Sequence, residues 1–174
     1  MLADVAIPAE FTMPCLLRGI DHLYLSVRDP VVSEAWYDRL MQALGLHKGD
    51  RAIAGEPHAH YLAPTFQLTL RPARSAVSHD PYVAGLHHLC FQVESRETVD
   101  QCHALIGALG ISVSGPRFYP EYNPEYYAIF FEDPDGIRLE IVARTSYRQA
   151  LQARWNEFDR FLNPLQALPP RDAG

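Results

Sequence analysis

Two stretches of the chain share one pattern and decide the fold: GIDHLYLSV at residues 19–27 and GLHHLCFQV at residues 85–93. Each begins with glycine, carries His-Leu at its fourth and fifth places, and ends on valine after alternating side chains. Strict alternation is typical of a strand with one buried face. A pattern that begins at residue 19 and returns at residue 85, 66 residues later, indicates duplication of one supersecondary unit.

A helical pattern follows each copy of the repeat. The first is predicted to begin with Asp29 as its N-cap and Pro30 at its first position, and to end at Gly45. The second is predicted to begin after Ser95 and to end at Gly110. We expect an apolar stripe along each helix, comprising Val32, Trp36, Leu40, Ala43 and Leu44 in the first, and Val99, His103, Ile106 and Leu109 in the second.

Short strands complete each half. The last strand is expected at residues 66–70 in the first half and at residues 137–141 in the second, where the tetrad at 133–136, Asp-Pro-Asp-Gly, is typical of a tight hairpin. Each half therefore reads as βαβββ. We expect an α+β fold with two such modules in tandem, forming a partly closed mixed sheet barrel. The expected divisions are an arm at 1–18, modules at 19–74 and 85–143, a linker at 75–84, and a C-terminal amphipathic helix and tail at 144–174.

Composition limits the class of partner. A formal net charge of -6 over 174 residues argues against nucleic acid, which favours a basic face. The first 18 residues lack the basic segment of a secretion signal, and the three cysteines then suggest reduced thiols. No apolar run approaches the ~20 residues that a membrane span needs. We expect a cytoplasmic protein that binds a small-molecule substrate, without nucleic acid or membrane.

Strand parity places candidate ligands on one face. The leucines of both repeats form the apolar face that a helix must cover, so His22 and His88 face the concave side. The same parity turns Glu140 inward, and we take Gln67 as its counterpart in the first module. Two imidazoles, a carboxylate and an amide oxygen suit one divalent ion acting as a Lewis acid.

The paired His-Leu strands, the two βαβββ modules and the ending DPDGIRLE at 133–140 resemble the vicinal oxygen chelate superfamily. This superfamily includes glyoxalase I, methylmalonyl-CoA epimerase, and fosfomycin-resistance and bleomycin-resistance proteins, together with extradiol dioxygenases. The resemblance covers residues 19–143. It implies that His22, His88 and Glu140 hold a Zn, Ni, Mn, Co or Fe(II) ion, with Gln67 as the fourth ligand, as in the epimerase pattern.

Further side chains are candidates for contacting a substrate. The segment RFYPEYNPEYY at 117–127 suggests a stiff aromatic lid, and alternatively a loop that packs its rings on the neighbouring module. Its candidate contacts are Arg117, Tyr122, Tyr126 and Tyr127. Arg138 shares the parity of Glu140 and either orients it or meets an anionic substrate. His60 is either a further inward imidazole or part of an exposed edge.

Three functions follow from this reading. The first is a metal-dependent lyase or isomerase of the glyoxalase type, in which Glu140 moves a proton and an enediolate-like intermediate forms from a substrate with vicinal oxygens. The second is Fe(II) extradiol ring cleavage, with His60 and Tyr127 as acid-base groups. The third is a non-catalytic drug-binding module of the bleomycin-resistance type.

A homodimer is also expected. The C-terminal helix, predicted at residues 145–162, carries a long apolar stripe, and the arm at 1–18 is largely apolar as well. Leaving such surfaces exposed is unfavourable for a monomer. The stripe comprises Tyr147, Leu151, Trp155, Phe158 and Leu162.

Overall fold

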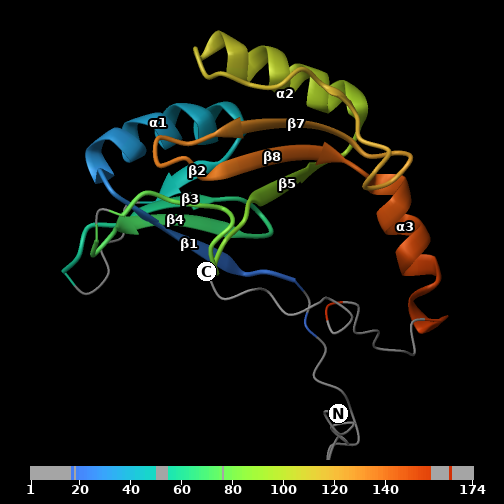
Figure 1. Ribbon diagram of the computed structural model, residues 1–174, viewed down its shortest axis with the longest axis horizontal. Coiled ribbons are helices and arrows are strands. Elements are labelled where there is room, and N and C mark those ends of the chain that lie inside the picture. The colour runs from blue at the N-terminus through green and yellow to red at the C-terminus, as the bar shows by residue number, and fades with distance from the viewer. Residues whose placement is uncertain (1–16, 18, 50–54, 76, 158–164, 166–174) are drawn as a thin grey trace, which may run out of the picture. The chain divides into compact units, whose positions relative to one another are not determined.

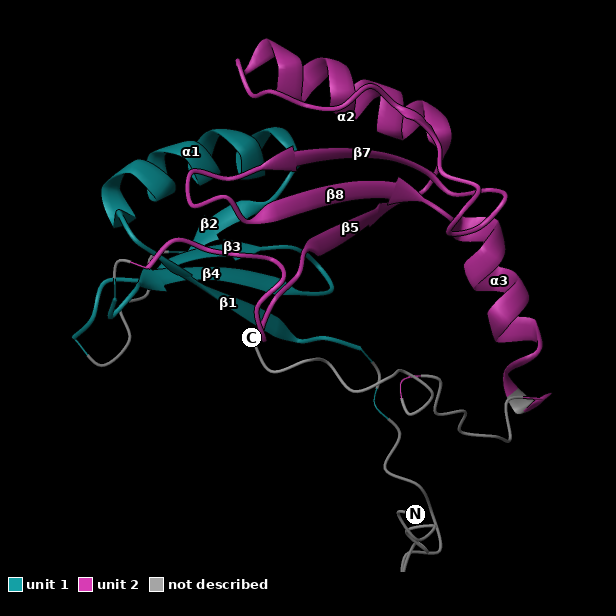
Figure 2. Cartoon of the chain, in the orientation of Figure 1, with its two compact units in different colours: residues 1–76 teal, residues 77–174 magenta. Residues whose placement is uncertain are grey.

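The protein is described by a computed structural model that covers residues 17, 19–49, 55–75, 77–157 and 165 (Figure 1). It divides into two compact units, residues 1–76 and residues 77–174, which are described separately (Figure 2). Nearly all of the expected N-terminal arm, and Phe158 and Leu162 of the expected stripe, lie outside the described residues.

Unit 1 is one βαβββ module. Its elements are β1 (His22–Val27), α1 (Pro30–Ala43), β2 (His47–Gly49), β3 (Ala59–Leu62) and β4 (Gln67–Pro72). The sheet has the strand order β1-β4-β3-β2, in which β1 runs parallel to β4 and the other pairs are antiparallel.

Unit 2 repeats this plan and adds a helix. Its elements are β5 (Leu89–Val93), α2 (Arg96–Ala108), β6 (Arg117–Phe118), β7 (Tyr127–Glu132), β8 (Arg138–Ala143), α3 (Thr145–Ala153) and the 3-10 turn η1 (Trp155–Glu157). The strand order is β5-β8-β7-β6, again with one parallel pair, β5 and β8. The expected α+β fold of two βαβββ modules is confirmed. The partly closed barrel is not seen, because the described strands form two separate open sheets of four strands.

The residues predicted to lie at the helix ends adopt the expected capping roles. The Asp29 carboxylate accepts hydrogen bonds from the backbone N–H groups of Val31 and Val32 at 3.1 Å, and Pro30 begins α1. Gly45 follows the helix with φ of +83°, a conformation that residues other than glycine rarely adopt. In unit 2, the Ser95 hydroxyl accepts from the N–H of Thr98 at 3.3 Å.

The expected stripe of α1 is wrong by about one residue. The buried positions of α1 are Ser33, Tyr37, Leu40 and Met41. Val32 is 52% exposed, so only Leu40 of the expected stripe is buried. Tyr37 supplies the reason, because its ring packs against that of Tyr61 from β3, with centroids 6.2 Å apart, and this contact sets the rotation of the helix. In α2, Val99 and Ile106 are buried as expected, whereas His103 is half-buried.

The two faces of each sheet differ in chemistry. Beneath the helices, the sheets contribute a buried apolar layer that includes Leu25, Val27, Leu68 and Leu70 in unit 1 and Ile129, Leu139 and Ile141 in unit 2. Side chains alternate along a strand, so the residues between these turn to the opposite, concave face. That face carries His22 and Gln67 in unit 1 and Glu140 in unit 2.

Helix α3 has no buried residue in the described chain, and Trp155 beyond it is 68% exposed. Among the described residues, no helix combines the length and apolarity required to cross a membrane.

Candidate metal centre

In unit 2 the structure brings His88 and Glu140 together. Glu140 lies in the middle of β8 and is only 1% exposed. Its Oε2 lies 3.4 Å from Nε2 of His88, which immediately precedes β5. Its Oε1 accepts a hydrogen bond of 2.5 Å from the hydroxyl of Tyr126. A buried carboxylate requires such partners, and these two leave it directed at an imidazole nitrogen.

The Glu140 carboxylate also affects its neighbours. Burial, followed by the hydrogen bond to Glu140, raises the pKa of Tyr126 far above its usual range, so the phenol remains a donor. Burial of the Cys90 thiol, followed by the charge of Glu140, raises the pKa of Cys90 to about 12. The residue as a whole is nevertheless exposed. Cys90 is therefore a neutral thiol at ordinary pH.

In unit 1 the structure brings His22 and Gln67 together. They are directly opposite each other on the parallel strands β1 and β4. The Gln67 amide nitrogen donates to Thr69 Oγ1 at 2.7 Å and lies 3.1 Å from His60 Nδ1. Because the nitrogen is fixed in this way, the amide oxygen is turned away from Thr69 and His60. An oxygen so placed fits the expected role of Gln67 as a ligand.

The strand register corrects the equivalence expected between Gln67 and Glu140. In unit 2, Glu140 pairs with Cys90, two residues beyond the repeated histidine. In unit 1, the residue paired two places beyond His22 is Thr69, opposite Tyr24. Thr69 is therefore the counterpart of Glu140. Matching Gln67 to Glu140 was therefore an error of two residues along the strand, and a shift of two residues keeps a side chain on the same face of the sheet.

His60 is on the concave face, and the alternative of an exposed edge is wrong. It lies on β3 opposite Thr69 and is 4% exposed. Its Nδ1 lies 3.0 Å from Thr69 Oγ1. Its ring stacks on that of His58, with centroids 5.9 Å apart.

The residue before each repeated histidine contacts that histidine. Asp21 Oδ2 lies 2.8 Å from Nδ1 of His22, and Nδ1 of His87 lies 2.7 Å from Nδ1 of His88. In both halves the contact engages Nδ1 and leaves Nε2 for another partner. Metal-binding histidines commonly have this arrangement, in which a partner at the second nitrogen fixes the ring.

The donors of each unit are of a kind that binds divalent ions. Unit 1 offers an imidazole Nε2 and an amide oxygen, from His22 and Gln67, and unit 2 offers an imidazole Nε2 and a buried carboxylate, from His88 and Glu140. Within the described chain, no three side chains of His, Cys, Asp or Glu already form a cluster able to hold a metal.

The aromatic segment at 117–127 packs partly on its own module. It forms a hairpin in which β6 pairs with β7, and the rings of Tyr119 and Tyr126 are buried. Tyr122 is 60% exposed, and its ring lies 5.2 Å from that of Tyr126. Arg117 stacks over the ring of Tyr119 at 4.6 Å. This segment therefore borders Glu140 through Tyr126, and the exposed ring of Tyr122 lies beside Tyr126.

Tyr127 is not part of this wall. Its hydroxyl donates to Asp100 of α2 at 2.9 Å, so the side chain lies on the helix-covered face of the sheet. The expected contact between Tyr127 and a substrate is wrong, because a change of one position along a strand moves a side chain to the other face.

Arg138 lies on the face of Glu140, two residues before it on β8. Its guanidinium sits over the ring of Phe130, 4.3 Å from the centroid. Within the described residues it forms no ion pair. Such a cation, held in place by a ring, is suited to meet an anionic group.

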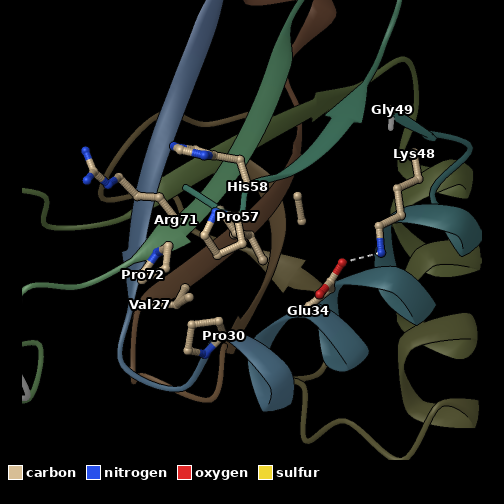
Figure 3. Close-up of a pocket in the computed structure, with 11 residues that line it drawn as sticks. Val27, Pro30, Glu34, Lys48, Gly49, Pro57, His58, Arg71 and Pro72 are labelled. Carbon is tan, nitrogen blue, oxygen red and sulfur yellow. Dashed lines mark hydrogen bonds and ion pairs between the residues drawn. The ribbon is translucent and has the colours of Figure 1, made fainter. Parts of the chain in front are cut away.

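A separate hollow of about 300 Å³ in unit 1 lies where β1 ends, away from His22 at the start of that strand (Figure 3). The charges that line it are already paired. Lys48 binds Glu34 at 2.6 Å, and Arg71 binds Glu56 at 2.9 Å. This hollow contains neither of the unit 1 ligand candidates.

A family model matches residues 19–141, which span both modules and all four candidate ligands. The chain belongs to the Glyoxalase/Bleomycin resistance protein/Dioxygenase superfamily. This result confirms the resemblance that the repeated His-Leu strands and the DPDGIRLE ending indicated.

The chain is similar to two curated proteins and to one solved structure of this fold. It is 29% identical over 126 residues to uncharacterized protein YqjT of Bacillus subtilis, covering 70% of this chain and 96% of the relative. It is 27% identical over 125 residues to metallothiol transferase FosB of Bacillus licheniformis, covering 72% and 75%. A variant of fosfomycin resistance protein FosX from Listeria monocytogenes, complexed with Mn(II) and 1S,2S-dihydroxypropylphosphonic acid, has a TM-score of 0.58 at 20% identity, covering 77% and 98%.

Proposed function

We propose that this superfamily member is a metal-dependent enzyme that acts, as a lyase or isomerase, on a small substrate with vicinal oxygens. The observation that carries the proposal is the contact between His88 and the buried carboxylate of Glu140, together with the equivalent imidazole of His22 in the other unit. His22, His88 and Glu140 hold one divalent ion, and Gln67 contributes its amide oxygen. A divalent ion held there would supply Lewis-acid polarisation of two adjacent substrate oxygens.

The side chains around the ion then perform separate tasks. Asp21 and His87 fix the two imidazole rings through Nδ1. Tyr126 holds Oε1 of Glu140 and leaves Oε2 to face His88. Glu140 moves a proton at the carbon next to the substrate carbonyl, through an enediolate-like intermediate. Arg138 binds an anionic group of the substrate, and Tyr122 covers it from the aromatic segment.

A second candidate is the addition of a nucleophile to a small phosphonate. The relatives FosB, a metallothiol transferase, and FosX, whose structure holds Mn(II) and a phosphonate, favour it. Arg138 also favours it, because within the described residues its guanidinium forms no ion pair and can meet an anion. The counterpart relation of Thr69 to Glu140 favours it as well, because it leaves three strong ligands, His22, His88 and Glu140. Ring cleavage is less favoured, because Tyr127, one of its two acid-base groups, faces α2. A drug-binding module without a metal would not need a buried carboxylate directed at an imidazole.

The two halves of the site come together within one chain or across a homodimer, and we propose the dimer. Light scattering at micromolar concentration tests it. A mass near twice 19.7 kDa supports the dimer, and a mass near 19.7 kDa contradicts it.

Elemental analysis of protein purified without added metal tests the function. We expect about one divalent ion per chain, without oxygen uptake in the presence of catechols. Activity is then measured with a hemithioacetal and with fosfomycin plus a thiol, which separates the two candidate reactions. Iron together with oxygen uptake would contradict both.

A further inference from the structure

His60 presents a buried nitrogen without a hydrogen-bond partner on the concave face of unit 1. The residue is 4% exposed, and Nε2 is shielded from solvent with no partner in the described part of the chain. Buried polar groups in folded proteins are almost always paired, and leaving one unpaired is costly. Nε2 is therefore available to a polar atom that the described residues do not supply.

The partners of the other ring nitrogen define what His60 offers. Gln67 Nε2, which can only donate, lies 3.1 Å from His60 Nδ1, and Thr69 Oγ1 lies 3.0 Å from it. The Thr69 hydroxyl itself accepts from Gln67 at 2.7 Å, so its own hydrogen is free to point at the imidazole. Nδ1 is thus the acceptor, and in a neutral ring Nε2 carries the hydrogen. His60 is fixed as an Nε2–H donor.

The strand register places His60 near the candidate ligands His22 and Gln67, but not at a ligand position. Along the concave face, His22 and Gln67 form one row, and Tyr24, Thr69 and His60 form the next. His60 is two strands across from His22 and two residues further along. With the usual strand spacing and rise, their Cα atoms lie roughly 12 Å apart. Nδ1 faces Thr69 and Gln67 of β4, so Nε2, on the other side of the ring, is the nitrogen left without a partner among the described residues.

We propose that His60 is a substrate-binding residue whose Nε2–H donates to the substrate oxygen on which negative charge develops. This inference rests on the proposed function, because it takes the substrate to be an oxygen chelator held at His22, His88 and Glu140. A preorganised neutral donor stabilises such an oxygen without exchanging a proton with it. Thr69 and Gln67 are the positioning residues that select the tautomer.

Long-range ¹H–¹⁵N NMR of the histidine side chains in the full-length protein tests the tautomer directly. We expect the His60 ring to carry its hydrogen on Nε2, and the Thr69→Val variant to lose this strict preference. A ring protonated on Nδ1 would overturn the proposal, because Nε2 would then be an acceptor. This measurement needs neither metal nor substrate, so its result is independent of the proposed function.

Binding of acetohydroxamate, a small chelator with vicinal oxygens, to the Mn²⁺-loaded protein tests the contact. By calorimetry, we expect His60→Phe to weaken hydroxamate binding about tenfold, with Mn²⁺ affinity changed by less than about threefold because only the hold on Gln67 is loosened. His60→Gln, which returns an N–H donor, should recover most of this loss. The control His58→Phe keeps the stacked ring next to His60 and should bind like the wild type.

The outcomes separate the two claims. Equal hydroxamate affinity in His60→Phe and wild type would overturn the role of His60 and leave the metal site standing. Failure of the wild type to bind Mn²⁺ would overturn the proposed function, and the NMR result would still decide the tautomer. Circular dichroism of each variant checks that the fold is retained.

Discussion

The concave faces of the two units share a histidine and differ in what accompanies it. At matching strand positions, unit 1 carries Thr69 and unit 2 carries Glu140. Thr69 is engaged by neutral partners, Gln67 and His60, whereas Glu140 is a buried carboxylate held by Tyr126. The duplication has therefore kept the imidazole and divided the other tasks. In the proposed site, unit 2 supplies the negative charge that a divalent ion requires, and unit 1 supplies hydrogen-bonding groups for a substrate.

Replacing Glu140 and its counterpart Thr69 by side chains of similar shape should give the largest difference in Mn²⁺ affinity between the two units. Glu140→Gln removes the single carboxylate among the candidate ligands and should weaken Mn²⁺ binding at least about 100-fold. Thr69→Val should change it by less than about threefold, because Thr69 contacts Gln67 and His60 instead of the metal. Electron paramagnetic resonance of free Mn²⁺ measures both affinities. Equal losses in the two variants would remove the distinction between the units.

The sequence predicted the features that depend on local pattern. The repeat, the caps at Asp29 and Ser95, and the inward parity of His22 and Glu140 follow from alternation and turn chemistry. It did not predict the register between strands, because Gln67 and Thr69 share a face and only pairing with β1 distinguishes them. Spacing did not help, because the correct counterpart Thr69 lies 47 residues after His22 whereas Glu140 lies 52 after His88, so the loops of the two halves differ in length.

Contacts between side chains also could not be predicted from the sequence. His60 was ambiguous because its strand is short and lies beside glycine- and proline-rich turns, and only burial shows that it faces inward. The contact of Asp21 with His22 was missed because neighbours on a strand usually diverge. At the start of β1 the two side chains meet nevertheless. The predicted buried face of α1 was wrong, because a count of apolar residues cannot tell whether the ring of Tyr37 or that of Trp36 is buried.

The second-largest effect concerns the partner of the carboxylate. Tyr126→Phe removes the hydrogen bond to Oε1 of Glu140 and should weaken Mn²⁺ binding about tenfold. The matched control is Tyr127→Phe, which removes the hydroxyl on the α2 side of the same strand region and should leave the affinity unchanged. A larger loss in the control than in Tyr126→Phe would place the site on the wrong face of the sheet.

A smaller effect is expected at the amide of unit 1. Gln67→Ala should weaken Mn²⁺ binding about fivefold, because a neutral amide oxygen contributes less than a carboxylate. The same Mn²⁺ titration measures this affinity. The variant Gln67→Glu should instead strengthen Mn²⁺ binding, because it adds a carboxylate near the ion. A loss as large as that of Glu140→Gln would show that unit 1 carries more of the site than proposed here.

The smallest effect is a change in thiol reactivity that reports the charge of Glu140. The negative charge disfavours the Cys90 thiolate, and burial acts in the same direction, raising its pKa to about 12. Removing the charge in Glu140→Gln lowers that pKa, so more thiolate exists at any pH below it. Iodoacetamide labelling at pH 9, followed by peptide mass spectrometry, should be several-fold faster at Cys90 in the variant. Cys102, whose pKa is raised by burial alone, is the internal control.

The central claim is that one imidazole from each unit binds the same divalent ion. Mn²⁺ titration of wild type, His22→Ala and His88→Ala, followed by electron paramagnetic resonance, tests it most directly. We expect about one tightly bound ion per chain in the wild type and a loss of tight binding in both variants, since each removes one of the shared ligands. Retention of the ion by His22→Ala with loss only in His88→Ala would show that unit 2 binds metal alone and would contradict the claim.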